Sequence, residues 1–168
     1  MKTTDNLIAE LTREAVTTRR VLERVPEDRL SWAPHPKSMT LGQLALHIAE
    51  IPGAVPEFLA EPMREVPDFG GRPEARSQAE LLAALDENVA NGTRRLTAWD
   101  DKDLEAAWTM VHGTETVFSA PRFEMIRSIM FNHWYHHRGE LLVYLRLLDQ
   151  PVPSVYGPSA DENPFAPA

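Results

Sequence analysis

The sequence predicts an all-α protein, a four-helix bundle with long connections and a docked proline-rich C-terminal tail. Two observations support this prediction. Apolar residues recur at steps of three and four, which is the period of a helix, while strand-like alternation hardly appears. Proline-rich segments separate four such helical stretches, an arrangement typical of a bundle. Because 168 residues is an ordinary size for one domain, we expect residues 1–168 to form a single domain, with residues 150–168 as its tail.

The first helix is expected to run from near the N-terminus to about Val25, where Pro26 ends it. Its inward positions are Leu7, Leu11, Ala15, Thr18 and Leu22. Residues 26–39 contain three prolines, so they are predicted to form a connecting loop. Burial of the Trp32 ring is expected to anchor this loop on the domain.

The second helix is expected to begin after Thr40, whose hydroxyl can cap it. Its inward positions are Leu44, His47, Ile48, Ile51, Val55 and Phe58. Pro52, Gly53 and Pro56 are expected to kink or interrupt the helix, because proline removes a backbone donor and glycine has a low helix propensity. One histidine therefore shares the core-facing side of this helix with aliphatic residues.

Residues 61–76 are predicted to be a loop because they hold three prolines and two glycines. Ser77 is expected to cap the third helix, with Glu80 completing a capping box, and the helix is expected to end near Trp99. Residues 100–120 fit no regular pattern. The stretch WTMVHGTETVFSA alternates weakly around a glycine, so either a short hairpin or an irregular crossover would fit it.

The fourth helix is expected to run from Pro121, a favoured first-turn residue, to about Asp149. Its inward positions are Phe123, Ile126, Met130, His133, His137, Leu141, Tyr144 and Leu148. The segment beyond it holds too much proline for a helix. The side chains expected to dock this tail on the domain are Val152, Val155, Tyr156 and Phe165.

Three histidines form the candidate site. His133 and His137 are one helical turn apart, and His47 lies on the core-facing side of the second helix, so the three imidazoles can converge on one ion. The axes of packed helices lie about 8–10 Å apart. Histidine side chains from two such helices can reach one ion between them, with metal–nitrogen distances of about 2.0–2.1 Å. A lone core histidine is more often hydrogen-bonded within the protein. Three buried imidazoles without partners would each cost about 1–3 kcal/mol, so a shared divalent cation is predicted.

The remaining polar residues near these histidines receive weaker assignments. His136 is offset around the helix and is interpreted as a surface residue or as a neighbour that contacts the ligands. Glu50, one turn after His47, is a candidate to accept a hydrogen bond from a ligand. The tail residues that are candidates to cover the metal and contact substrate are Tyr156, Ser159, Asp161 and Glu162. The residues expected to be solvated or uninvolved are His35, His112, Arg138, Glu140 and Arg146.

Composition limits the classes of function. The net charge is −8 and the basic residues are scattered, which argues against a nucleic-acid partner. There is no cysteine, so a metal must be held by nitrogen and oxygen, and no cysteine nucleophile can act. No stretch reaches about 18 consecutive apolar residues and the N-terminus does not look like a signal peptide, so we expect a cytoplasmic protein without a membrane partner.

Three stretches, SWAPHPKSMTLGQLALHIAE, NHWYHHRGELLVYLRLL and PVPSVYGPSADENP, resemble the DinB/YfiT-like superfamily, four-helix-bundle proteins regarded as metalloenzymes. The resemblance covers nearly the whole chain in order. It implies that His47, His133 and His137 hold a divalent metal, commonly nickel or zinc in that family. Characterised relatives include transferases that use bacillithiol, mycothiol or glutathione, and a mycothiol-dependent maleylpyruvate isomerase. Relatives also often form homodimers, which we expect here as well.

The leading hypothesis is a metal-dependent transferase that acts on a small electrophile with a low-molecular-weight thiol. Three protein ligands leave a coordination position open, as in catalytic sites. A metal-dependent hydrolase is the second enzymatic hypothesis. The third is a non-catalytic bundle that binds a metal or a small ligand. Three nitrogens do not distinguish nickel or zinc from iron, cobalt or copper by ligand type.

Overall fold

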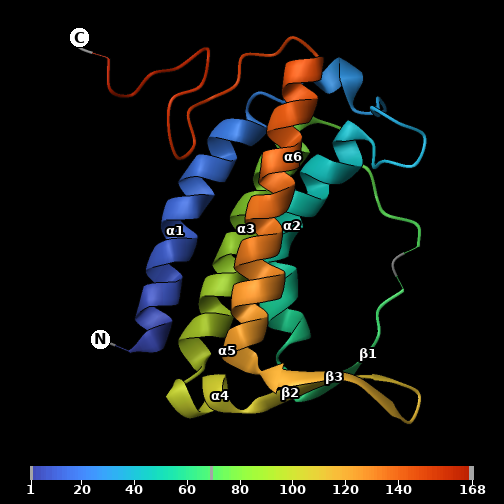
Figure 1. Ribbon diagram of the computed structural model, residues 1–168, viewed down its shortest axis with the longest axis vertical. Helices are drawn as coiled ribbons and strands as arrows, with labels where there is room; N and C mark the ends of the chain where they lie inside the picture. Colours follow the sequence, from blue (N-terminus) through green and yellow to red (C-terminus); the bar gives the residue numbers. More distant parts are fainter. Residues whose placement is uncertain (1, 69, 167–168) are drawn as a thin grey trace.

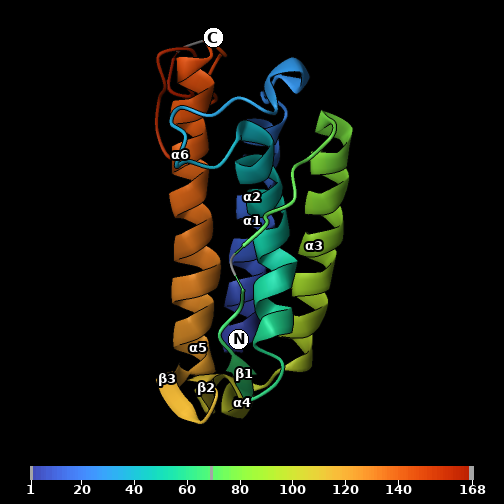
Figure 2. The ribbon, with the colours of Figure 1, turned by 90° about the vertical axis from the view of Figure 1, so that its right-hand side faces the viewer.

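A computed structural model of the protein describes residues 2–68 and 70–166, and its four long helices lie side by side (Figure 1). These are α1 (Thr3–Leu22), α2 (Leu41–Phe58), α3 (Gln78–Ala98) and α6 (His133–Leu147). Helix α3 packs against α1 and α2, and α6 packs against α2 and α1 (Figure 2). Residues 1 and 167–168 of the predicted domain and tail, and residue 69 of the predicted loop 61–76, lie outside the described residues.

Helix α2 starts where its cap was predicted and continues through both of its prolines. The backbone N–H of Gln43 donates to Thr40 Oγ1 (3.2 Å), and the Thr40 N–H donates to Gln43 Oε1 (3.0 Å). Pro52 and Pro56 lie inside the helix, which is not interrupted as far as Phe58. The expected interruption is therefore absent, because packing against neighbouring helices compensates for the lost backbone bonds.

Two glycines allow α2 and α3 to approach closely. A Cβ atom on Gly92 would lie 2.2 Å from the Pro52 carbonyl oxygen, and one on Gly53 would lie 2.9 Å from the Asn88 Cα atom. Neither position has room for a larger side chain, so the glycine predicted to weaken α2 is explained by contact with α3.

Ser77 caps α3 as predicted, accepting from the Glu80 N–H at 3.1 Å. The Glu80 carboxylate accepts from Arg76 N–H at 2.6 Å instead of completing a capping box.

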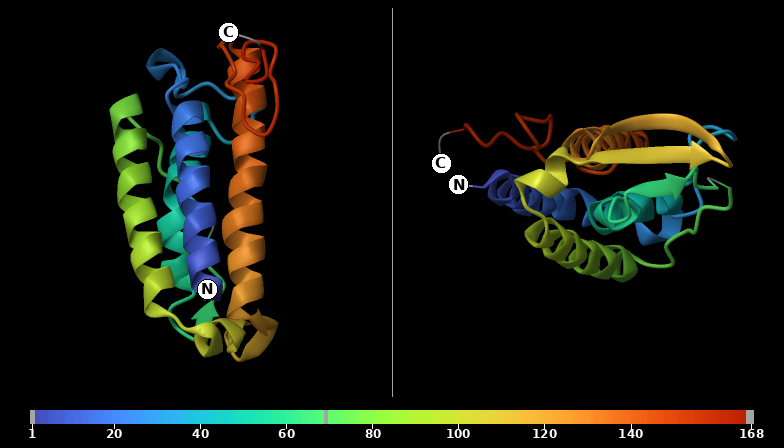
Figure 3. Two further views of the ribbon diagram at one scale, coloured as in Figure 1. Left: turned by 90° about the vertical axis from the view of Figure 1, so that its left-hand side faces the viewer. Right: turned by 90° about the horizontal axis from the view of Figure 1, so that it is seen from below.

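A small sheet corrects the all-α prediction. Its strands are β1 (Met63–Glu65), β2 (Ala107–His112) and β3 (Glu115–Pro121), in the order β1-β2-β3. Strand β1 runs parallel to β2, and β2 runs antiparallel to β3. The sheet lies across one end of the helices, next to the short helix α4 (Asp101–Glu105) (Figure 3). Of the two possibilities for residues 100–120, the hairpin is the one that forms, turning at Gly113 with a φ of 59°.

Strand β1 was not predicted and the hairpin was only one of two possibilities, because most side chains of the sheet face water. Every residue of β1 is exposed, and Trp108 is the buried residue of β2. Without a regular buried face there is no alternation of apolar and polar residues to read. The predicted loop 61–76 thus contains a strand that only its pairing with β2 specifies.

The predicted fourth helix is divided into three segments. They are α5 (Arg122–Met125), a π-helical segment η2 (Ile126–Asn132) and α6. The side chain of Phe123, predicted to face the core, is 37% exposed, whereas Ile126 and Met130 are fully buried. Helix α6 ends at Leu147, close to the predicted end near Asp149.

The segment after α6 lies beside α1 and α6 and is held mainly by charged side chains (Figure 1). Glu162 pairs with Arg20 and with Arg24, and Asp161 pairs with Arg146. Val152 is buried, but Phe165, which was predicted to dock, is 76% exposed. In residues 2–68 and 70–166, no helix is long and apolar enough to cross a membrane.

Arg138 corrects the expectation of a solvated charge on α6. Its side chain is almost completely buried, where it donates to Glu14 Oε2 (2.6 Å) and to Thr18 Oγ1 (3.1 Å) of α1. The Tyr156 hydroxyl, from the tail, also bonds to Arg138 and donates to Glu14 (2.9 Å). These four residues, which we call the Arg138 network, join α1, α6 and the tail, although the Tyr156 side chain is itself mostly exposed.

Candidate metal centre

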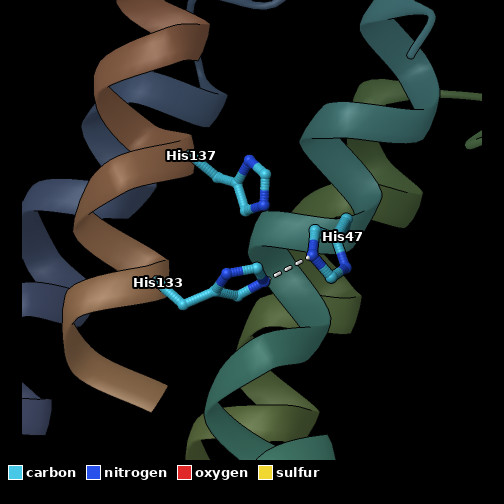
Figure 4. Close-up of side chains that lie close together, drawn as sticks. All are labelled: His47, His133 and His137. Carbon is cyan, nitrogen blue, oxygen red and sulfur yellow. Dashed lines mark hydrogen bonds between the residues drawn. The ribbon is translucent and has the colours of Figure 1, made fainter. Parts of the chain in front are cut away.

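The structure brings together the three histidines that helical spacing placed on facing sides. His47 comes from the middle of α2, while His133 and His137 occupy the first and second turns of α6 (Figure 4). One ring nitrogen of each lies within 4.8 Å of the others, and His47 Nε2 is 3.0 Å from His133 Nε2. Nitrogens that bind one ion at about 2.0–2.1 Å are roughly 3–3.5 Å apart, so a small adjustment of His137 suffices.

The surroundings keep these imidazoles neutral. Burial, followed by the charge that His137 would carry, lowers the pKa of His47 to about 3. Burial also lowers the pKa of His133 to about 4, and it lowers the pKa of His137. A neutral imidazole offers a lone pair, which a metal ion requires. The donor set of three neutral nitrogens therefore fits a divalent cation, and this cluster could hold a metal ion.

Glu140 orients one of the three rings, contrary to its interpretation as a solvated charge. Its Oε2 lies 2.5 Å from His137 Nδ1, which leaves Nε2 of that ring to face His47 and His133. A carboxylate on the outer nitrogen of a histidine fixes the tautomer and strengthens the inner nitrogen as a ligand. The spacing of three residues between His137 and Glu140 would have indicated this contact.

The other histidines lie outside the cluster. His136 is largely exposed, with its Nε2 3.4 Å from Glu140 Oε1, so it contacts the partner of a candidate ligand. His136, His137 and Glu140 also lie close enough to hold an ion, although this set shares His137 with the more buried one. His35 is in the loop before α2, where its Nδ1 accepts from the Lys37 N–H at 3.1 Å. His112 is exposed in the sheet beside Glu65.

Two cavities meet at the histidines. A cavity of about 450 Å³ has mostly apolar walls, and a second of about 280 Å³ is lined by polar and charged groups. Both are bordered by His47, His133 and Glu50. Burial raises the pKa of Glu50, which lies three residues after His47 on α2. The predicted neighbour Glu50 thus does lie at the site.

The tail candidates are placed elsewhere. The Tyr156 hydroxyl bonds within the Arg138 network, and Asp161 pairs with Arg146 and accepts from the Val152 N–H at 2.8 Å. Within the part of the chain that the structure describes, neither residue borders the two cavities at the histidines. The structure therefore brings Glu50, Glu140 and His136 near the candidate ligands, but not Tyr156 or Asp161.

The comparison with family models gives a match that spans nearly the whole chain. The model of the DinB family matches residues 1–164. The chain belongs to the DinB family. Among curated proteins, no significant match to this DinB protein was found.

Solved structures show the same fold. A DinB-like protein from Bacillus cereus ATCC 10987 superposes with a TM-score of 0.68 at 22% identity, covering 90% of this chain and 97% of the other. The DinB-like protein YjoA from Bacillus subtilis superposes with a TM-score of 0.67 at 16% identity, covering 89% and 96%. At these identities, the likeness establishes the DinB-like fold and leaves the reaction to be argued from the site.

Proposed function

We propose that this DinB protein is a metal-dependent transferase that joins a low-molecular-weight thiol to a small electrophile. The observation that carries the proposal is the cluster of three neutral imidazoles, two of which, His47 and His133, border both cavities. Three protein ligands leave at least one coordination position free, and the cavities let small molecules reach it. Nickel and zinc are the preferred ions because the resemblance to the DinB/YfiT-like superfamily favours them, and iron, cobalt and copper are compatible with the same nitrogens.

A divalent ion at this site would lower the pKa of a thiol that reaches it and so supply a nucleophile at neutral pH. The thiol gives up its proton and its sulfur forms a bond to the electrophilic carbon. The bond from that carbon to the leaving group breaks, and the leaving group departs with the electron pair. Glu50 borders both cavities and its raised pKa makes it a suitable acceptor for the thiol proton, while Glu140 holds His137 in place.

The test is a comparison of metal content and rate between wild type and His133→Ala, both purified without chelator or nickel resin. We expect wild type to retain about one ion per chain and to accelerate the displacement of a leaving group from model electrophiles by the thiol. The variant should lose the ion and roughly 100-fold or more of the rate. His35→Ala is the matched control, because this loop histidine is exposed and does not belong to the cluster. Equal rates in wild type and His133→Ala, across several thiols, would rule out the transferase.

Glu50 also supports a second candidate, a metal-dependent hydrolase. A half-buried carboxylate beside a three-histidine cluster could accept a proton from an attacking water as readily as from a thiol. The two functions differ in their need for a co-substrate. Turnover of ester or amide substrates by the metal-loaded protein without any thiol would favour the hydrolase.

A non-catalytic metal-binding bundle is the remaining alternative. It predicts a closed coordination sphere and a large fall in Tm after chelation, without turnover of any substrate. The cavities beside His47 and His133 count against it, because a purely structural ion is normally sealed by its ligands.

A further inference from the structure

The larger cavity is lined mostly by apolar side chains. Its lining comes from α2, from the π-helical segment, from strand β2 and from the connection after β1. The apolar residues that line it are Ile51, Ala54, Val55, Phe58, Pro67, Met110 and Ile129. Glu50, at the border with the second cavity, is the one carboxylate among the described residues around it. A negatively charged group inside this cavity would lose its water without gaining a positively charged side chain as a partner.

The smaller cavity has more polar and charged residues in its lining. It is lined by Gln43, Asp68 and Arg72, together with glycines of the connection that crosses in front of α2 (Figure 2). Arg72 is close enough to the histidines for its positive charge to lower their pKa values. Side chains of both signs suit a polar, charged molecule. The two cavities therefore offer different environments on the two sides of His47 and His133.

The apolar wall is held by packing around it. The Phe58 ring lies 5.3 Å from the Trp108 ring, and Trp108 is completely buried. Ile51 is also buried in the core, while Met110 belongs to the central strand of the sheet. A preformed wall loses little conformational entropy when a ligand binds. The volume, about 450 Å³, lies within the usual range for small-molecule sites.

We propose that the apolar cavity binds the electrophile, and that the electrophile is an uncharged molecule whose bulk is apolar. The polar co-substrate then approaches His47 and His133 from the side of Arg72. This inference rests on the proposed transferase, since it assigns the two substrates of that reaction to the two cavities. Its physical basis is that apolar surface gains about 25 cal/mol per Å² on burial, whereas a buried charge without a partner is costly.

The test uses metal-free protein and needs neither thiol nor turnover. Fluorine NMR measures the binding of para-fluorotoluene, an uncharged apolar probe, and of para-fluorobenzoate, which has a similar ring and a charge. We expect the toluene to bind at least tenfold more tightly than the benzoate, because the carboxylate must lose water beside Glu50. Nuclear Overhauser contacts from the bound toluene to the Met110 methyl group should locate it.

A variant at Ala54 blocks the cavity from its exposed side. Ala54 lines the cavity but is not part of the core, so Ala54→Phe can fill the space without displacing buried residues. We expect Ala54→Phe to weaken para-fluorotoluene binding by about tenfold or more. Ala54→Ser is the matched control and should bind as wild type does.

Three outcomes would overturn the inference. They are benzoate binding as tightly as toluene, toluene binding without contacts to Met110, and toluene binding unchanged in Ala54→Phe. Failure of the transferase assay is separate, because the cavity can bind the apolar probe whether or not a thiol reacts at the histidines.

Discussion

Polar groups are buried on both sides of α6, but they differ in whether other residues of the chain satisfy their hydrogen bonds. Toward α1, Arg138 finds acceptors on Glu14, Thr18 and Tyr156, so the Arg138 network is satisfied within the chain. Toward α2, His47 and His133 direct their Nε2 atoms at each other across the border of two cavities. A buried polar group that the chain itself satisfies serves the fold. Lone pairs that converge beside a cavity are available to a ligand.

Removing Arg138 from the Arg138 network should have the largest effect on stability. Arg138→Ala leaves the Glu14 carboxylate largely buried without its cation. We therefore expect the free energy of unfolding to fall by about 3–5 kcal/mol, measured by urea denaturation. Arg146→Ala removes the exposed pair with Asp161 and should leave stability nearly unchanged. Equal stabilities for Arg138→Ala and Arg146→Ala would mean that the Arg138 network does not support the fold.

A substitution at the histidines, on the side of α6 toward α2, should change the stability of the metal-free protein much less. In chelator-treated protein, His133→Leu replaces a half-buried imidazole with an apolar group of similar size. We expect its free energy of unfolding to stay within about 1 kcal/mol of wild type, because the leucine buries apolar surface that offsets the lost contact with His47 Nε2. Metal titration followed by calorimetry should show the loss of tight binding. A fall of several kcal/mol without metal would instead make His133 a structural residue.

Glu140→Gln tests whether the site extends beyond its three histidines. The amide cannot fix the His137 tautomer as the carboxylate does at 2.5 Å, so we expect metal affinity to fall about 10–100-fold. Competition with a chromophoric chelator measures the affinity. Glu87→Gln, on the exposed face of α3, serves as the control and should retain wild-type affinity.

The smallest effect concerns the tail and pH. Bonds from Arg146 lower the pKa of Asp161, and the Ser154 N–H with Arg20 lowers that of Glu162. Because both carboxyl groups have lower pKa values in the folded state, their contribution is complete above the unfolded pKa and is lost as pH falls through the folded pKa. We expect the Val152 amide, which donates to Asp161, to lose hydrogen-exchange protection in acid before the helices do. Simultaneous loss everywhere would contradict a separately docked tail.

The sequence predicted the long helices and the meeting of the histidines because both depend on helical period. Once α2 and α6 face one another, the spacing from His133 to His137 and the position of His47 on its stripe determine that the rings converge. That a metal binds there stays a prediction.

Features that depend on pairing between distant segments were missed. The contact of β1 with β2 joins residues far apart in the chain and buries little, so no local pattern marks it. Arg138 looked like a solvated charge because its partners, Glu14 and Thr18, lie on another helix. Glu140 was missed for a different reason. Its spacing of three residues from His137 was visible in the sequence, but the sequence does not show which ring nitrogen of His137 faces the carboxylate.

The π-helical segment before α6 has a consequence for how the HxxxH motif is presented. A π turn closes with one more residue than an α turn, so every side chain after it is rotated relative to an uninterrupted α-helix, by about 100° for each extra residue. The residue count of Ile126–Asn132 therefore helps to set the direction in which His133 and His137 point. A chain one residue shorter there would carry the same motif and direct it away from α2.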